Sequence, residues 1–106
     1  MLFIKDGVSP RSFYIIAAVA NAAQALELNV TITAGTNGKH MQGSLHYKDR
    51  AIDVRSKNLT DKKGFLSTVL LRLGSDYEGI LEHEGLDNEH FHFEYDPKIN
   101  KDAVNA

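Results

Sequence analysis

The chain contains no cysteine among its 106 residues. Disulfide bonds and thiolate-bound zinc are therefore both excluded, and a metal ion could be held only by imidazole and carboxylate groups. A long apolar run is also missing, because polar residues interrupt the longest mostly apolar stretch, residues 13–28, which is too short to cross a bilayer. We therefore expect no membrane insertion.

A strong excess of charge of either sign is lacking. Twelve Lys and Arg residues stand against fourteen Asp and Glu residues, for a formal net charge of −2, and the basic residues are scattered along the chain. This distribution does not predict nucleic-acid binding. Residues 1–7 lack the basic and apolar regions of a secretory signal, so we expect the protein to be cytoplasmic where it is made.

The remaining composition is ordinary for a globular protein, with 42% hydrophobic and 25% charged residues. The length allows one domain over residues 1–106, and the polar segment from about residue 97 is expected to be a tail. We expect the protein to be a monomer.

Two helices are predicted from the spacing of apolar residues. Ser9 and Pro10 are typical of a helix N-terminus, and the Ala-rich residues 11–28 have apolar positions at three-to-four spacing. A second helix is predicted over residues 60–73, followed by Gly74 as a C-cap.

Four strands are predicted from β-branched and alternating segments, at residues 29–34, 50–55, 77–82 and 89–95. A loop with three glycines occupies residues 35–43. The order of elements predicts an α+β domain, in which two helices pack on one face of a small, mainly antiparallel sheet of about four strands.

Alternation along the last predicted strand separates two kinds of side chain. His90, His92 and Glu94 share one face, whereas three aromatic residues share the other, where they would face the helices. On the strand at residues 50–55, Asp53 lies on the face opposite the apolar positions, and His46 shortly precedes that strand. We therefore expect His46, Asp53 and His92 to converge between neighbouring strands.

These three residues are a ligand set that zinc takes in catalytic sites, where a fourth position is left for water. The metal acidifies that water and makes it a nucleophile at neutral pH, so the set predicts a zinc-dependent hydrolase. His90 and His92 alone are a weaker indication, because His-x-His on a strand is often only a solvated polar face. The combination with His46 and Asp53 is more specific than either pair.

Ser44, His46, Ala51 and Asp53 match the motif Ser-x-His-x-x-Gly-x-Ala-x-Asp. With a histidine on the last strand, the chain resembles the LAS-type zinc peptidases, which include D-Ala-D-Ala carboxypeptidases, D-Ala-D-Ala dipeptidases and the L-alanyl-D-glutamate endolysins of phages. The resemblance covers most of the chain and implies His46, Asp53 and His92 as zinc ligands. Asp49 replaces the motif glycine and can tolerate a left-handed turn.

The resemblance also implies a carboxylate base three residues before the last ligand, a place that Glu89 occupies. Strict alternation would put Glu89 on the face away from His92, unless the strand begins at His90. Glu82 and Glu84 are rival bases, and all three carboxylates could be plain surface charge. We expect His90 to orient the ligands or stabilise an oxyanion.

Three further residues are candidates for substrate binding. Arg55 shares the face of Asp53 and could bind a substrate carboxylate or form a salt bridge. Ser44 would bond within the loop near His46, and His40 could line a cleft or be a solvated loop residue.

The function that the resemblance implies is hydrolysis of the stem peptide of bacterial peptidoglycan by a zinc metallopeptidase of the carboxypeptidase or phage endolysin type. Such a protein would act on the cell wall once released. Two alternatives remain open: a non-catalytic domain that binds zinc or wall peptide, and a phage structural component that retains only the fold.

Overall fold

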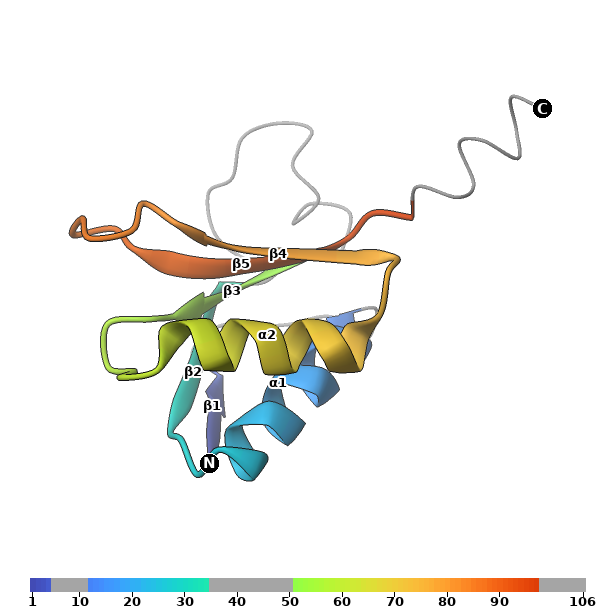
Figure 1. The fold of residues 1–106 in the computed structure, drawn as a ribbon, viewed down its shortest axis with the longest axis horizontal. Coiled ribbons are helices and arrows are strands. Elements are labelled where there is room, and N and C mark those ends of the chain that lie inside the picture. Colours follow the sequence, from blue (N-terminus) through green and yellow to red (C-terminus); the bar gives the residue numbers. More distant parts are fainter. Residues whose placement is uncertain (5–11, 35–50, 98–106) are drawn as a thin grey trace.

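The computed structural model describes residues 1–4, 12–34 and 51–97. Five strands form one sheet in the order β1-β2-β3-β5-β4 (Figure 1). β1 runs parallel to β2, and the other neighbouring pairs are antiparallel. The strands are β1 (Leu2–Ile4), β2 (Val30–Ala34), β3 (Ala51–Arg55), β4 (Tyr77–Glu82) and β5 (His90–Tyr95).

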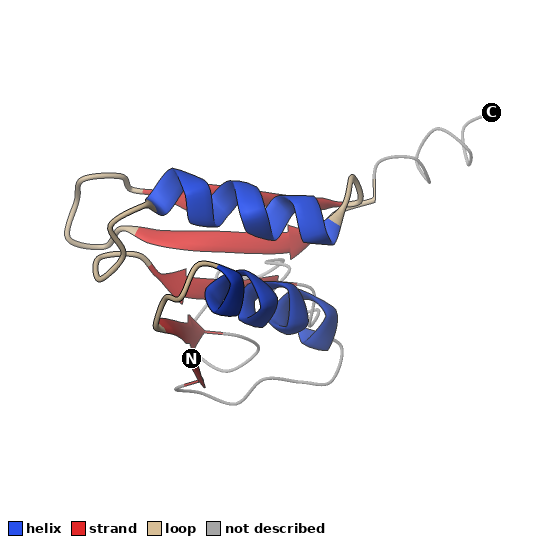
Figure 2. Cartoon of the chain, turned by 60° about the horizontal axis from the view of Figure 1, so that its bottom comes forward, coloured by secondary structure: helices blue, strands red, loops and turns tan. Residues whose placement is uncertain are grey.

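Helices α1 (Phe13–Ala25) and α2 (Lys62–Leu73) cover the same face of the sheet and contact each other (Figure 2). The predicted α+β class, with two helices on one face of a mainly antiparallel sheet, is confirmed. The prediction of four strands was short by β1, whose three residues are too few for an alternating pattern to be recognised. Neither helix among the described residues is long and apolar enough to cross a membrane.

The end of α1 is set by a left-handed residue. Glu27 has φ 56, its amide donates to the Gln24 carbonyl at 3.2 Å, and the Leu28 amide donates to the Ala23 carbonyl at 2.9 Å. These two bonds form a Schellman motif, which ends the helix at Ala25 and turns the chain into β2. The helix prediction over residues 11–28 therefore ran too far, and Ser9 and Pro10 lie outside the described residues.

Both ends of α2 follow from side-chain and backbone chemistry. The Asp61 carboxylate accepts a hydrogen bond from the Gly64 amide at 3.0 Å, which caps the first turn. Gly74 ends the helix with φ 89 and ψ −176, a conformation that is essentially restricted to glycine. The predicted second helix agrees with these bounds.

Aromatic side chains from α2 and β5 form the centre of the core. Phe65, Phe91 and Phe93 are each 0% exposed. The ring centroid of Phe65 lies 5.1 Å from that of Phe91 and 6.4 Å from that of Phe93. Apolar residues of α1, β2 and β3 complete the same cluster. The core therefore lies entirely between the helices and one face of the sheet.

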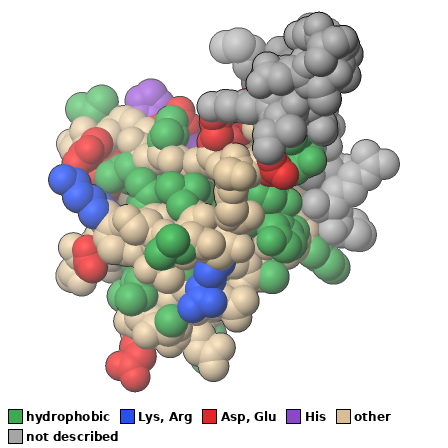
Figure 3. Space-filling view, turned by 45° about the vertical axis from the view of Figure 1, so that its right-hand side comes forward, with side chains coloured by type: hydrophobic (Ala, Val, Ile, Leu, Met, Phe, Trp, Pro, Cys, Tyr) green, Lys and Arg blue, Asp and Glu red, His purple; other side chains and the backbone are tan. Residues whose placement is uncertain are grey.

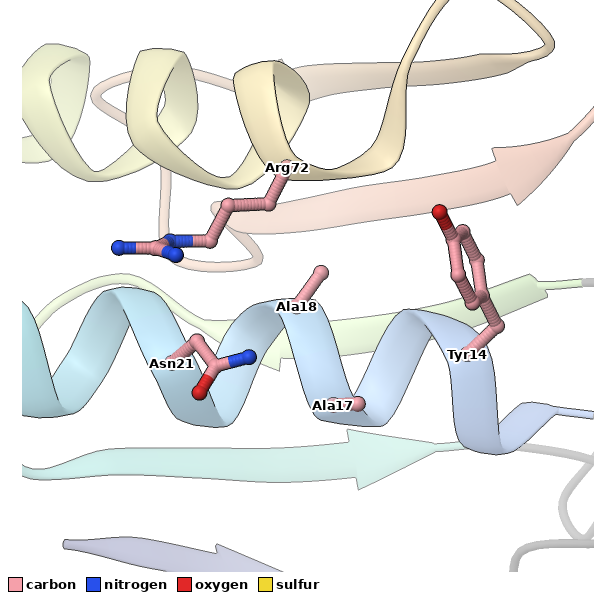
Figure 4. Close-up of a pocket in the computed structure, with 5 residues that line it drawn as sticks. All are labelled: Tyr14, Ala17, Ala18, Asn21 and Arg72. Atoms are coloured by element: carbon pink, nitrogen blue, oxygen red, sulfur yellow. The ribbon is translucent and has the colours of Figure 1, made fainter.

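Small side chains of α1 line part of its contact with α2. A hollow of about 320 Å³ opens at their contact, and Figure 4 shows Arg72 of α2 reaching across it toward Asn21 of α1. Ala17 and Ala18 lie along α1 at this contact, and Tyr14 lies at one end. This hollow is on the helix side of the molecule, away from the opposite face of the sheet.

Candidate metal site

The face of the sheet that no described helix covers carries the polar residues of three neighbouring strands. On β3 and β5, Asp53 lies opposite His92 and Arg55 lies opposite His90. On the other side of β5, Glu82 of β4 lies opposite His90. Strand alternation thus brings Asp53 and His92 together on one face, as the sequence predicts.

The imidazole of His92 lies between two carboxylates. Its Nδ1 is 2.8 Å from Oδ1 of Asp53, and its Nε2 is 2.8 Å from Oε1 of Glu94. Burial lowers the pKa of His92, but the hydrogen bonds and charges of Asp53 and then of Glu94 outweigh it and leave that pKa raised. Two carboxylates therefore favour a positive charge at this point, either a proton or a cation.

Asp53, Glu82 and His92 each offer one ligand atom, and these atoms all lie within 4.8 Å of one another. Ligand atoms around a tetrahedral zinc ion are about 3.3 Å apart, given metal–ligand distances of about 2.0 Å. The distances from Nδ1 of His92 to Asp53 and Glu82, 2.8 Å and 3.7 Å, bracket that value. Glu94, on the other ring nitrogen, fits the outer carboxylate that orients a metal-bound histidine. The described residues therefore include groups able to hold a metal ion.

His90 lies at the rim of this cluster. Its Nδ1 is 2.9 Å from the carbonyl oxygen of Asn88, a group that can only accept a hydrogen bond. Its Nε2 faces Glu82 Oε1 at 3.3 Å and Asp53 Oδ1 at 3.8 Å. This places His90 beside the two carboxylates, and its predicted orienting role toward the ligands stays a prediction.

Glu89 is directed away from the cluster, although β5 begins only at His90. Its carboxylate accepts hydrogen bonds from Ser56 Oγ at 2.6 Å, Lys62 Nζ at 2.6 Å and the Gly85 amide at 2.9 Å. The bond from Lys62, followed by those from Ser56 and Gly85, lowers the pKa of Glu89 from 4.5 to about 2. A carboxylate tied to α2 in this way is a structural ion pair, and its low pKa is unsuited to a general base near neutral pH.

The remaining predicted site residues divide into two groups. Arg55 is exposed at the end of β3, on the face of the cluster. The predicted third zinc ligand and the loop candidates, His46, Ser44 and His40, lie outside the described residues, as does Asp49.

Two members of the cluster had no assigned ligand role from the sequence. The sequence predicts Glu82 only as a rival base, and Glu94 only as a neighbour on the same face. Their positions depend on the register of β4 against β5, which pairs Glu82 with His90 and Glu78 with Glu94. Alternation predicts which face a residue occupies, but the partner strand must be known before the neighbours are.

Fold and site together define a small α+β domain with an imidazole–carboxylate cluster on the helix-free face of its sheet. Residues 8–83, more than two thirds of the chain, match the family of the Hedgehog amino-terminal signalling domain. The chain belongs to this family. The match includes Asp53 and Glu82 and ends before β5, which carries His92.

The family assignment corrects the functional predictions made from the sequence. The match is to signalling domains and not to LAS-type zinc peptidases, so the predicted peptidoglycan peptidase, its stem-peptide substrate and its carboxypeptidase or endolysin type are wrong. The alternatives of a wall-peptide binder and a phage component have no support either. The motif residues predict metal ligands, and metal ligands by themselves do not imply hydrolysis.

The cellular setting and the catalytic roles change with the family. Hedgehog signalling domains are secreted extracellular ligands, so the prediction of a cytoplasmic protein that is released onto bacterial cell wall is wrong. The role of base predicted for Glu89 and the oxyanion-stabilising role predicted for His90 presuppose the peptidase and fall with it. The geometry of Glu89 agrees with this correction.

Proposed function

We propose that this chain is a signalling domain that acts by binding a partner protein, and that it holds a zinc ion on the helix-free face of its sheet. The cluster of Asp53, Glu82 and His92 is the observation that carries the proposal. It combines an imidazole with carboxylates, the donor types to which a chain without cysteine is restricted. Zinc binding is general among Hedgehog amino-terminal domains, which supports the choice of metal.

Asp53 and His92 are the zinc ligands we propose among the described residues, with His46 as the third ligand expected from the sequence motif. Glu94 would hold the second nitrogen of the His92 ring and so keep the first one directed at the metal. Zinc would supply positive charge among the carboxylates of Asp53, Glu82 and Glu94, which His92 and His90 adjoin.

The helix-free face is the proposed surface for a receptor or another signalling partner. Ile80, 53% exposed, lies opposite His92 in the register of β4 and β5, so an apolar side chain is accessible beside the charged cluster. An exposed apolar residue next to a charged cluster is a combination that partner-binding surfaces use. Bound zinc would fix the orientation of Asp53 and His92 and lower the negative charge that a partner meets.

A zinc titration of the purified chain tests the metal site. We expect one zinc per chain by metal analysis, and His92→Ala should weaken zinc binding by at least about 100-fold in calorimetry. The matched control is His83→Asn, which removes an exposed histidine from a turn with φ 54, a conformation that asparagine tolerates. Equal zinc affinity in the wild type and His92→Ala would overturn this site.

A Hedgehog-responsive reporter cell line tests the signalling role separately. We expect the zinc-loaded chain and the His83→Asn control to bind the cells saturably and change the reporter signal, and His92→Ala to do so less. Zinc binding without any cell binding or response would leave the metal site intact and contradict the signalling proposal.

A further inference from the structure

The outer edge of β4 is a second surface with binding capacity. β4 lies last in the strand order, and among residues 1–4, 12–34 and 51–97 no strand pairs with its outer side. An edge of this kind presents unpaired backbone amides and carbonyls, which natural proteins usually protect or use for recognition.

The hydrogen bonds between β4 and β5 determine which backbone amides and carbonyls of β4 point away from the sheet. The Asp96 amide donates to the Asp76 carbonyl at 2.9 Å, and Asp76 and Asp96 continue the register in which Tyr77 lies opposite Tyr95. Because bonded and non-bonded pairs alternate in an antiparallel ladder, the even-numbered residues of β4 bond to β5. The amides and carbonyls of Gly79 and Leu81 therefore point outward.

A groove of about 260 Å³ runs beside this edge on the helix side, where Leu66 and Leu81 contribute apolar walls. Gly79 is part of the groove, and a Cβ added there would lie 2.5 Å from the Phe93 ring. Glycine at this position lets β4 lie close over the core and leaves its edge without a side chain. Figure 3 shows hydrophobic side chains exposed between charged ones on the side of the molecule that carries α2 and β4.

Charge differs between the two sides of the edge. Glu78 and Glu82 share the helix-free face with Glu94, so a strand added beside β4 would meet these two carboxylates on that face, with the exposed Ile80 between them. On the helix side it would meet the groove, where Leu66 and Leu81 are apolar and Lys62, Lys63 and Glu84 also contribute to the walls. The two sides therefore favour a strand with basic side chains on one face and apolar side chains on the other.

We propose that the outer edge of β4 takes up an extended segment of a partner protein as a sixth strand, with basic residues facing Glu78 and Glu82 and apolar residues facing the groove. The occupant is not a second copy of this chain, because two antiparallel β4 edges would bring the same glutamates onto one shared face. Like charges across strands destabilise such a pairing. The proposal rests on the partner-binding role proposed above, and because Glu82 also belongs to the metal-binding candidates, it is tested on the zinc-free chain.

A peptide of about ten residues with alternating lysine and valine is the probe. We expect it to bind the zinc-free chain and to shift the NMR amide signals of Gly79 and Leu81, whereas a peptide of alternating glutamate and valine does not. Shifts confined to other parts of the chain, or equal binding of both peptides, would overturn the proposal.

N-methylated peptides test the backbone ladder without altering the protein. All lysine amides of an extended strand point to one side and all valine amides to the other. Methylating one series should therefore abolish binding, and methylating the other should leave it nearly unchanged. The same effect from both series would exclude strand addition.

A charge variant tests the proposed orientation. Glu78→Gln should weaken binding of the lysine peptide by about threefold to fivefold, whereas Glu27→Gln, at the end of α1, should not change it. Analytical ultracentrifugation of the chain without peptide tests whether a second copy occupies the edge. If the chain forms a dimer that Leu81→Asp abolishes, the edge binds a second copy and the proposal is contradicted. Failure of peptide binding with intact zinc binding leaves the metal site unaffected.

Discussion

The two faces of β5 show how one strand can serve two purposes. On the side that the helices cover, Phe91 and Phe93 are 0% exposed and pack against Phe65. On the other side, His92 and Glu94 are only partly buried and are held by hydrogen bonds. The same six residues therefore contribute to the core through one set of side chains and to the imidazole–carboxylate cluster through the other.

This difference separates folding from binding at the level of single residues. Close-packed aromatic side chains lose both transfer free energy and packing when they are truncated, so the covered face should dominate stability. Half-exposed polar groups contribute less to folding, so the helix-free face should be changeable without unfolding.

The largest effect is expected from the covered face. Phe93→Ala should lower the free energy of unfolding by about 3–5 kcal/mol, because it leaves a cavity beside two other phenylalanines. Ile80→Ala, at a position 53% exposed on β4, should change it by less than about 0.5 kcal/mol. Urea denaturation measures both, and equal losses would contradict the distinction between the faces.

Overpacking tests the covered face from the opposite direction. Gly79→Ala would place its Cβ 2.5 Å from the Phe93 ring and 3.1 Å from Leu70, at an expected loss of about 1–3 kcal/mol. Phe93→Leu should relieve part of this clash, so the double variant should lose less than the sum of the single losses. Strict additivity in thermal denaturation would show that the two residues do not compete for space.

Glu89 joins the covered side to α2, and its contribution should depend on pH. Its folded-state pKa is lowered to about 2, so the stability it contributes is present above its ordinary value of 4.5 and is lost as the pH falls to about 2. Glu89→Gln should lower the melting temperature at neutral pH and make stability less dependent on pH in that window.

Circular dichroism during acid titration measures this difference between Glu89→Gln and the wild type. Glu84→Gln is the matched control, because that carboxylate is exposed in the neighbouring turn. An acid transition in Glu89→Gln as steep as that of the wild type would exclude the ion pair with Lys62 as its source.

The smallest effect on folding is expected on the helix-free face. Glu94→Gln should lower zinc affinity by about 10–100-fold, because it weakens the hydrogen bond that orients the His92 ring. The free energy of unfolding of the metal-free chain should change by less than about 0.5 kcal/mol. A large loss of stability with unchanged zinc affinity would reverse the roles given to the two faces.

Local patterns in the sequence are sufficient for much of this fold. The alternation around His92 predicts both the buried phenylalanines and the polar face, and Gly74 predicts the C-terminal end of α2. Side-chain alternation also places Asp53 and His92 on the same face, and they come close together once β3 and β5 are assumed to be neighbours. Apart from that strand pairing, these features depend on residues that are near one another in the chain.

Features that depend on distant residues could not be predicted in the same way. The roles of Glu82 and Glu94 require the register of β4 against β5. The partners of Glu89 come from the end of β3, the start of α2 and a turn, and no periodicity in the sequence brings these together. Function could not be predicted from these residues, because the same metal-ligand motif is compatible with more than one activity.

The separation of Asp53 and His92 along the chain has a thermodynamic consequence. They are 39 residues apart in sequence but lie on adjacent central strands, so a cation that both hold is a cross-link that the unfolded chain cannot make. Binding would then be linked to folding, and zinc at a hundredfold excess over its dissociation constant would add about 2.7 kcal/mol to the folded state. The availability of metal in the surroundings would in this way set the folding free energy of the domain.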